Sequence, residues 1–242
     1  MLLAHMSDLH LDGSVRARER TARVMTYLDG LDDLDAVLVT GDLTDHGAEA
    51  EYEELMKLLP SRHPVLTCPG NHDVRAAYRT VVLGEDAADA PVNQVHRIGG
   101  AVFAMCDSTI PGRPDGALSG ETLDWLAGAL ADTAGEPVFV GFHHPPMPLG
   151  NPYVDELRLH GEHQLAALVA AYPQVVAVLC GHAHTAAVTR FAGVPLLVAP
   201  GIASTITLPW EHRDLYDHEL PPGIAFHVVG EDRRLTTHYR FL

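Results

Sequence analysis

Short apolar runs alternate with segments of helical character along the chain, and this alternation restricts the fold more than any other feature. Each run is bounded by polar residues, Gly or Pro, as is typical of a buried strand. The expected strands are Leu2–Met6, Ala36–Thr40, Pro64–Cys68, Ala101–Cys106, Pro137–Phe142, Val175–Cys180 and Leu196–Ala199. The expected helices are Val15–Leu28, Ala48–Leu59, Val74–Leu83, Glu121–Leu130 after an N-cap at Ser119, and His160–Ala171. Alternating strands and helices indicate an α/β fold.

The length of 242 residues allows a sizeable core, and because single α/β domains reach this length we predict one domain over residues 1–242. Residues 202–242 combine prolines with two apolar runs, Ile224–Val229 and Leu235–Leu242, which predict a loop followed by a terminal hairpin. This tail could cap a site, form a homodimer contact or complete a sheet. The sequence does not decide among the three.

The formal net charge of −16 restricts the class of partner. A broad basic surface for binding the phosphates of a nucleic-acid polymer is not expected from this composition. If the substrate is anionic, bound cations and a few donors must supply the attraction locally.

Cysteines and apolar segments favour a cytoplasmic protein. Cys68, Cys106 and Cys180 are odd in number and lie in or at the end of apolar runs, so we expect buried thiols. The N-terminus lacks the pattern of a signal peptide. The longest apolar region, Leu165–Leu179, is interrupted by Pro173 and is too short to span a bilayer, so no membrane partner is expected.

Candidate metal ligands follow the expected strands directly. In open α/β sheets the carboxyl ends of the strands border a crevice where ligands bind. Asp8 and His10 follow the first strand two positions apart, so both can face one cation. Asp42 follows the second strand after Gly41, and its carboxylate could bridge two metals. A lone Asp-x-His pair also occurs by chance on surfaces, and we expect Asp45 to cap the next helix.

The third strand ends in a more specific string, Pro-Gly-Asn-His-Asp. Asn71 offers a carbonyl oxygen ligand, and His72 beside Asp73 can serve as a held proton donor. A turn with a helix cap at Asp73 is the alternative.

Histidines follow two further strands, as His143 with His144 and as His182 with His184. Neutral imidazoles suit metal ligation through either ring nitrogen. A single histidine at such a position is usually structural. Five polar clusters at the ends of five strands favour one shared site.

In order, the blocks Asp-x-His, Gly-Asp, Gly-Asn-His-Asp, His-His-Pro-Pro and Gly-His-x-His resemble the calcineurin-like metallophosphoesterase superfamily. The resemblance runs from Met6 to His184 and is strongest to bacterial class III cyclic nucleotide phosphodiesterases and related glycerophosphodiesterases. It implies a four-layer αββα sandwich of two mixed β-sheets flanked by helices, with the active site at the C-terminal ends of strands.

The resemblance also implies two metal ions that share Asp42. One would be held by Asp8, His10, Asp42 and His184, and the other by Asp42, Asn71, His143 and His182. His143 rather than His144 matches the ligand, and His144 is expected to pack or to contact substrate. Oxygen and imidazole donors without thiolate favour Mn, or Fe with Mn, with Zn and Co as alternatives.

The expected reaction is hydrolysis of a small phosphodiester, 3′,5′-cyclic AMP first, by in-line attack of a hydroxide that bridges the metals. His72 would donate a proton to the leaving oxygen, with Asp73 fixing its orientation. A glycerophosphodiester phosphodiesterase would use the same groups. A phosphoprotein phosphatase would need an open, shallow site, and a non-enzymatic metal-binding module would lack a ligand or His72. Specificity is expected from loops near Asp12–Arg20, Arg75, Asp107–Gly116 and the tail.

Overall fold

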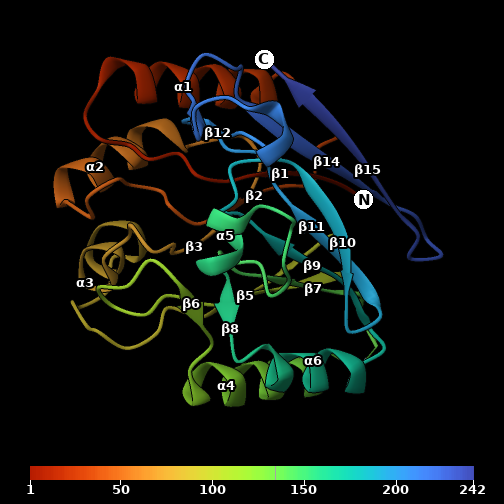
Figure 1. Cartoon of the computed structure of the whole chain (residues 1–242). Coiled ribbons are helices and arrows are strands. Elements are labelled where there is room, and N and C mark those ends of the chain that lie inside the picture. The colour runs from red at the N-terminus through yellow and green to blue at the C-terminus, as the bar shows by residue number, and fades with distance from the viewer. Residues whose placement is uncertain (134) are drawn as a thin grey trace.

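Two mixed β-sheets lie face to face in the computed structural model, which describes residues 1–133 and 135–242 (Figure 1). The five-stranded sheet has the order β15-β14-β1-β2-β3, and the six-stranded sheet has the order β10-β11-β9-β7-β5-β4. The strands of the first are β1 (Leu2–Met6), β2 (Ala36–Thr40), β3 (Val65–Cys68), β14 (Gly223–Val229) and β15 (Leu235–Phe241). Those of the second are β4 (Gln94–Ile98), β5 (Ala101–Met105), β7 (Val138–Gly141), β9 (Val175–Cys180), β10 (Ala187–Phe191) and β11 (Val194–Val198).

Helices cover the outer face of each sheet and complete four layers (Figure 1). The first sheet carries α1 (Val15–Asp29), α2 (Glu49–Leu58), the single turn α3 (Arg75–Ala77) and the π-helix η1 (Tyr78–Leu83). The second carries α4 (Gly120–Ala131) and α6 (Glu162–Ala171). Shorter elements are α5 (Pro152–Glu156), η2 (Pro209–Glu211), β6 (Gly116–Ala117), β8 (Leu159–His160), β12 (Thr205–Ile206) and β13 (Tyr216–Asp217). The predicted αββα sandwich is confirmed.

Three apolar clusters hold the layers together. Leu28 of α1 and Leu55 of α2 pack on the outer face of the first sheet, and Leu126 of α4 packs on the outer face of the second. Phe103 and Phe139 stack between the sheets with their ring centroids 5.3 Å apart. Burial of apolar surface on both faces explains why the central strands are near-continuous apolar runs.

Parallel pairing aims several strand ends at one edge. β1, β2 and β3 are parallel to one another, as are β5, β7, β9 and β11. Ser7, just after β1, bridges to Gly201, just after β11, so the ends of the two sheets meet. The loops that leave β1, β2, β3, β7 and β9 therefore converge.

The tail divides into two parts with different roles. Its last strands form the predicted terminal hairpin, in which β14 pairs antiparallel with β1 and completes the first sheet. Residues 202–222 instead form a loop with the small β12–β13 pair.

The three cysteines are buried free thiols, as predicted. Among the described residues, no helix is long and apolar enough to cross a membrane.

Candidate metal centre

The residues predicted as ligands meet at the ends of five strands, around one cavity of about 450 Å³. A cavity of this volume is in the range of small-molecule sites. His10, Asp42, Asn71, His182 and His184 line it. Asp8 and His143 lie fully buried behind them.

One group of donors combines the loop after β1 with the loop after β9. The Nε2 atoms of His10 and His184 lie 3.1 Å apart. His10 Nε2 is 3.4 Å from Asp42 Oδ2, and His184 Nε2 is 3.5 Å from Asp8 Oδ1. Two carboxylates and two imidazoles thus point at a common centre, with donor atoms within 4.8 Å of one another.

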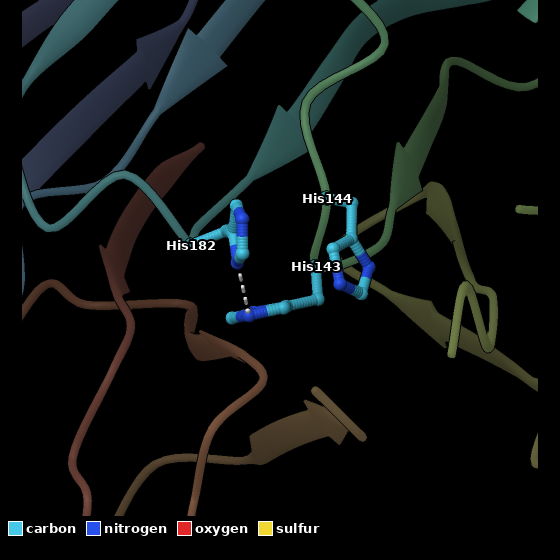
Figure 2. A group of neighbouring side chains, drawn as sticks. All are labelled: His143, His144 and His182. Atoms are coloured by element: carbon cyan, nitrogen blue, oxygen red, sulfur yellow. Dashed lines mark hydrogen bonds between the residues drawn. The ribbon is translucent and has the colours of Figure 1, made fainter. Parts of the chain in front are cut away.

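A second group lies on the other side of Asp42. His143 Nε2 is 3.3 Å from Asp42 Oδ2 and 3.2 Å from His182 Nδ1 (Figure 2). His182 Nδ1 is also 3.1 Å from Asn71 Oδ1. Asp42 therefore faces both groups, as the sequence predicts for a shared residue.

Hydrogen bonds at the far ring nitrogens fix which nitrogen each imidazole presents. His143 Nδ1 donates to the Thr40 carbonyl at 2.7 Å, and His10 Nδ1 lies 2.8 Å from Asp45 Oδ1. His184 Nδ1 is held by Ser204 Oγ at 2.9 Å. These partners leave the Nε2 lone pairs directed at the centre, which is the arrangement that metal-binding histidines use.

The backbone at the centre is held in an uncommon conformation. Asp8, His10, Asp42, His182 and His184 all have positive φ, between 42° and 67°. Such left-handed residues cost free energy when they are not glycine, and they concentrate at functional sites. Across the described chain only three other non-glycine residues share this conformation, namely Ala192, His212 and Arg233.

Two glycines make room for the close approach. A Cβ at Gly41, which has φ +91°, would collide with the His143 ring, and a Cβ at Gly70 would collide with Asp42. These positions explain the Gly-Asp and Gly-Asn-His-Asp blocks of the sequence, because only glycine leaves space for the neighbouring side chains.

Burial and the pairing of Asp42 with His143 together set the electrostatics of the centre. Burial raises the pKa of Asp8 to about 6, with His143 opposing the shift. It lowers the pKa of His182 and of His184 to about 3, so both imidazoles are neutral. Against the effect of burial, Asp42 raises the pKa of His143 to about 9, and His143 holds the pKa of Asp42 well below its usual range.

This donor set fits divalent cations. Within the part of the chain that the structure describes, the ion-pair partners of Asp8 and Asp42 are all histidines, so no lysine or arginine neutralises the two buried carboxylates. Converging carboxylate oxygens and imidazole lone pairs are the ligands of transition metals, and thiolate is absent from the cluster. Cations that replace the proton of His143 would relieve the charge imbalance.

His72 lies at the rim of the cavity, but Asp73 does not orient it. The Nδ1 of His72 donates to the Asp45 carbonyl at 2.8 Å, and its backbone N–H donates to Asp42 Oδ1 at 2.9 Å. Asp73 is buried and accepts from Leu43 N, Thr44 N, Thr44 Oγ1, Gly70 N and Tyr52 Oη. The predicted orienting role of Asp73 is wrong, because backbone amides of the two adjoining loops occupy its oxygens.

Asp45 also differs from its prediction as a helix cap. Helix α2 begins after Ala48, where Glu51 reaches back to the backbone N–H groups of Ala48 and His46. The carboxylate of Asp45 is engaged by the His10 imidazole instead.

His144 lies beside His143 and His182, and donor atoms of the three rings lie within 4.8 Å of one another (Figure 2). It is fully buried, its Nδ1 is 2.8 Å from Ser108 Oγ, and its Nε2 has no partner in the described chain. It does not line the cavity. His144 therefore packs beneath the centre, and of these two neighbours it is His143 whose Nε2 faces Asp42.

The walls of the cavity come largely from the expected loops. Two of these loops contribute Asp12, Ser14, Arg16 and Pro114. The tail contributes Ala203, Ser204, Ile206, Tyr216 and His218. Arg75 does not, because its guanidinium is bound to Asp107 Oδ2 and to the Asp89 and Thr109 carbonyls. A further wall, formed by Tyr153, Val154 and Leu157, could not be predicted from the sequence, since nothing in that segment resembles the motif blocks.

Fold and site together define a class of enzyme. The calcineurin-like phosphoesterase family matches residues 1–186, and the chain belongs to this family. It is a hydrolytic enzyme of the metallophosphoesterase type, with a cluster of residues suited to a dinuclear metal centre.

Particular relatives are phosphodiesterases. The glycerophosphodiester phosphodiesterase GpdQ of Enterobacter lignolyticus is 34% identical, over 96% of this chain and 88% of its own. The 3′,5′-cyclic adenosine monophosphate phosphodiesterase CpdA of Pseudomonas aeruginosa is 30% identical, over 98% of this chain and 88% of its own. A dimetal phosphatase from Danio rerio shares the fold, with a TM-score of 0.74 and 14% identity over 100% of this chain and 96% of its own.

Proposed function

We propose that this protein is a dinuclear metal-dependent phosphodiesterase that hydrolyses 3′,5′-cyclic AMP. The observation that carries the proposal is the pair of donor groups on either side of Asp42, beside a small cavity with His72 at its rim. The similarity to CpdA supports a cyclic nucleotide. The free buried thiols are consistent with a reducing compartment, and we place the reaction in the cytoplasm.

The two metals would be held as the donor groups suggest. Asp8, His10, Asp42 and His184 would hold one, and Asp42, Asn71, His143 and His182 the other. Mn, or Fe with Mn, suits these oxygen and imidazole donors, and Zn and Co are alternatives. When bound, such ions supply Lewis-acid activation of the phosphate and of water.

His72 would assist the leaving group. Because the Asp45 carbonyl can only accept, Nδ1 of His72 must carry a proton, and the ring presents Nε2 to the cavity. Nε2 has no hydrogen-bond partner among the described residues and is free to donate once protonated. A proton given to the departing 3′-oxygen there would spare that oxygen a full negative charge.

A variant of His72 tests this role together with the substrate. We expect His72→Ala to retain its metals and to lose roughly 100-fold or more of its turnover of cyclic AMP. The loss should be far smaller on bis(p-nitrophenyl) phosphate, whose leaving group needs no proton. Steady-state rates of the Mn-loaded proteins on both esters measure this, with the exposed His238→Ala as control. Equal losses on the two esters would refute the proton donation.

A glycerophosphodiester is the second candidate substrate, favoured by the similarity to GpdQ over nearly the whole chain. The same donors and His72 would serve it. Catalytic efficiencies of the Mn-loaded protein for cyclic AMP and for glycerophosphoethanolamine separate the two. A higher value for the glycerophosphodiester would overturn the proposed preference.

A further inference from the structure

Two tyrosines from distant segments meet at the cavity beside the candidate metal centre. Tyr153 belongs to α5 and Tyr216 to β13, and their hydroxyl oxygens lie 3.2 Å apart. Their ring centroids are 6.3 Å apart with the planes at 81°. Both line the cavity, and we call this pair the aromatic wall. Despite their size, Tyr153 is 42% and Tyr216 39% exposed.

The aromatic wall lies within reach of a substrate bound at the centre. The ring of Tyr216 is 6.0 Å from the ring of His184, centroid to centroid. Val154, Leu157 and Ile206 line the same cavity, so apolar groups accompany the two rings. The cavity thus joins a polar floor that suits a phosphate to a wall that suits a flat, apolar group.

His218 adds a second flat surface next to Tyr216. The two rings are nearly parallel, at 20°, with centroids 6.2 Å apart, and both border the cavity. Base–aromatic stacking needs only a free ring face and tolerates any base, since every base has a π-face. A tyrosine that served packing alone would be covered, whereas Tyr216 is left open to the cavity.

We propose that Tyr216 of the aromatic wall is the stacking platform for the nucleobase of the substrate. The inference rests on the proposed phosphodiesterase and deepens it, because it assigns the substrate to the nucleotides. A glycerophosphodiester has no ring for this platform, so Tyr216 would favour cyclic nucleotides over glycerophosphodiesters by selective binding. Tyr153 packs edge-on against the ring of Tyr216, a contact that a phenylalanine at position 216 would keep.

The test compares two ligands that differ at C1′, where one carries adenine and the other a hydroxyl. Dissociation constants of 5′-AMP and of ribose 5-phosphate are measured by calorimetry on the Mn-loaded protein. The variants are Tyr216→Leu, which removes the ring, and Tyr216→Phe, which keeps it. Trp210→Leu is the matched control, since Trp210 is an aromatic residue of the same loop, is 65% exposed and lies outside the cavity.

We expect Tyr216→Leu to weaken 5′-AMP binding about ten-fold, within the range of base stacking on an aromatic side chain, and to leave ribose 5-phosphate unchanged. Tyr216→Phe and Trp210→Leu should bind both ligands as the wild type does. The inference would be overturned if Tyr216→Leu weakened both ligands equally or left 5′-AMP binding unchanged. It would also be overturned if the wild type bound 5′-AMP no tighter than ribose 5-phosphate. Failure of the proposed function is seen separately, as absence of cyclic AMP hydrolysis by the wild type.

Discussion

Asp73 joins the loop after β2 to the loop after β3. Its buried carboxylate accepts hydrogen bonds from Leu43 N, Thr44 N and Gly70 N, and from the hydroxyls of Thr44 and Tyr52. Burial raises its pKa, with neighbouring Asp42 adding to the shift and the bonds from Gly70 and Leu43 opposing it. These loops carry the candidate ligands Asp42 and Asn71, so Asp73 stabilises the position of both loops relative to each other.

Replacement of Asp73 should therefore affect stability first. In Asp73→Asn an amide N–H₂ faces backbone donors, and we expect the free energy of unfolding to fall by about 3 kcal/mol. Urea unfolding of the metal-loaded protein measures this, with the exposed Asp86→Asn as control. Unchanged stability together with a large loss of turnover would instead restore the orienting role that the sequence suggested.

At the residue scale, the sequence predicts where the candidate ligands lie better than it predicts which groups hydrogen-bond to them. The seven candidate ligands could be predicted because each directly follows an apolar run, and strand ends gather in an α/β sheet. The hydrogen bond between His10 and the Asp45 carboxylate could not be predicted, because it spans 35 positions and depends on how two loops meet. The same holds for the partners of Asp73. The sequence around it is as compatible with a helix cap as with a side chain that links two loops.

A chain of side-chain hydrogen bonds centred on strands β1 and β14 runs across four strands of the first sheet. His5 Nδ1 is 3.1 Å from His227 Nε2, and His5 Nε2 is 2.9 Å from Thr40 Oγ1. The far nitrogen of His227 is 2.9 Å from Thr237 Oγ1. Burial lowers the pKa of His227 to about 3 and that of His5 well below its usual value, so both rings are neutral near pH 7.

This chain predicts a loss of stability in mild acid. Below about pH 6.5 a histidine binds a proton in the unfolded chain but not in the fold, so stability falls as the pH falls from 6.5 towards 3. In His227→Gln the decrease in unfolding free energy between pH 7 and pH 5 should be about 2 kcal/mol smaller than in the wild type.

Urea unfolding at the two pH values measures that difference. Metal release in acid contributes to both proteins and cancels in the comparison. His238→Gln, exposed on the neighbouring strand β15, should behave as the wild type. Equal losses of stability in acid for His227→Gln and the wild type would contradict the prediction that His227 is buried in its neutral form.

At the element scale, the central strands and main helices follow the sequence closely, and the edges do not. β4 and β10 were not predicted, because both are edge strands that alternate exposed with half-buried residues, apart from the buried Phe191, and they include the polar Gln94, Arg97 and Arg190. The segment Val74–Leu83 was predicted as one helix but is a single α-turn followed by a π-helix. Periodicity alone does not distinguish these two helical forms.

The whole molecule carries a net charge of −16, yet its proposed substrate is an anion. The global field therefore opposes binding, and the attraction must come from the cavity itself. Arg16 is the one lysine or arginine among the described cavity residues. Most of the local positive charge would have to come from bound metals, so binding of the anionic substrate depends on them.

Metal content of the wild type and of Asp42→Ala tests the central claim most directly. Elemental analysis after Mn loading and desalting should give two ions per chain for the wild type and a loss of both in Asp42→Ala, because both donor groups share this carboxylate. Asp12→Asn, an acidic residue of the same cavity outside both groups, should keep both ions. Circular dichroism of each variant verifies the fold. Two tightly bound ions in folded Asp42→Ala would contradict the shared centre.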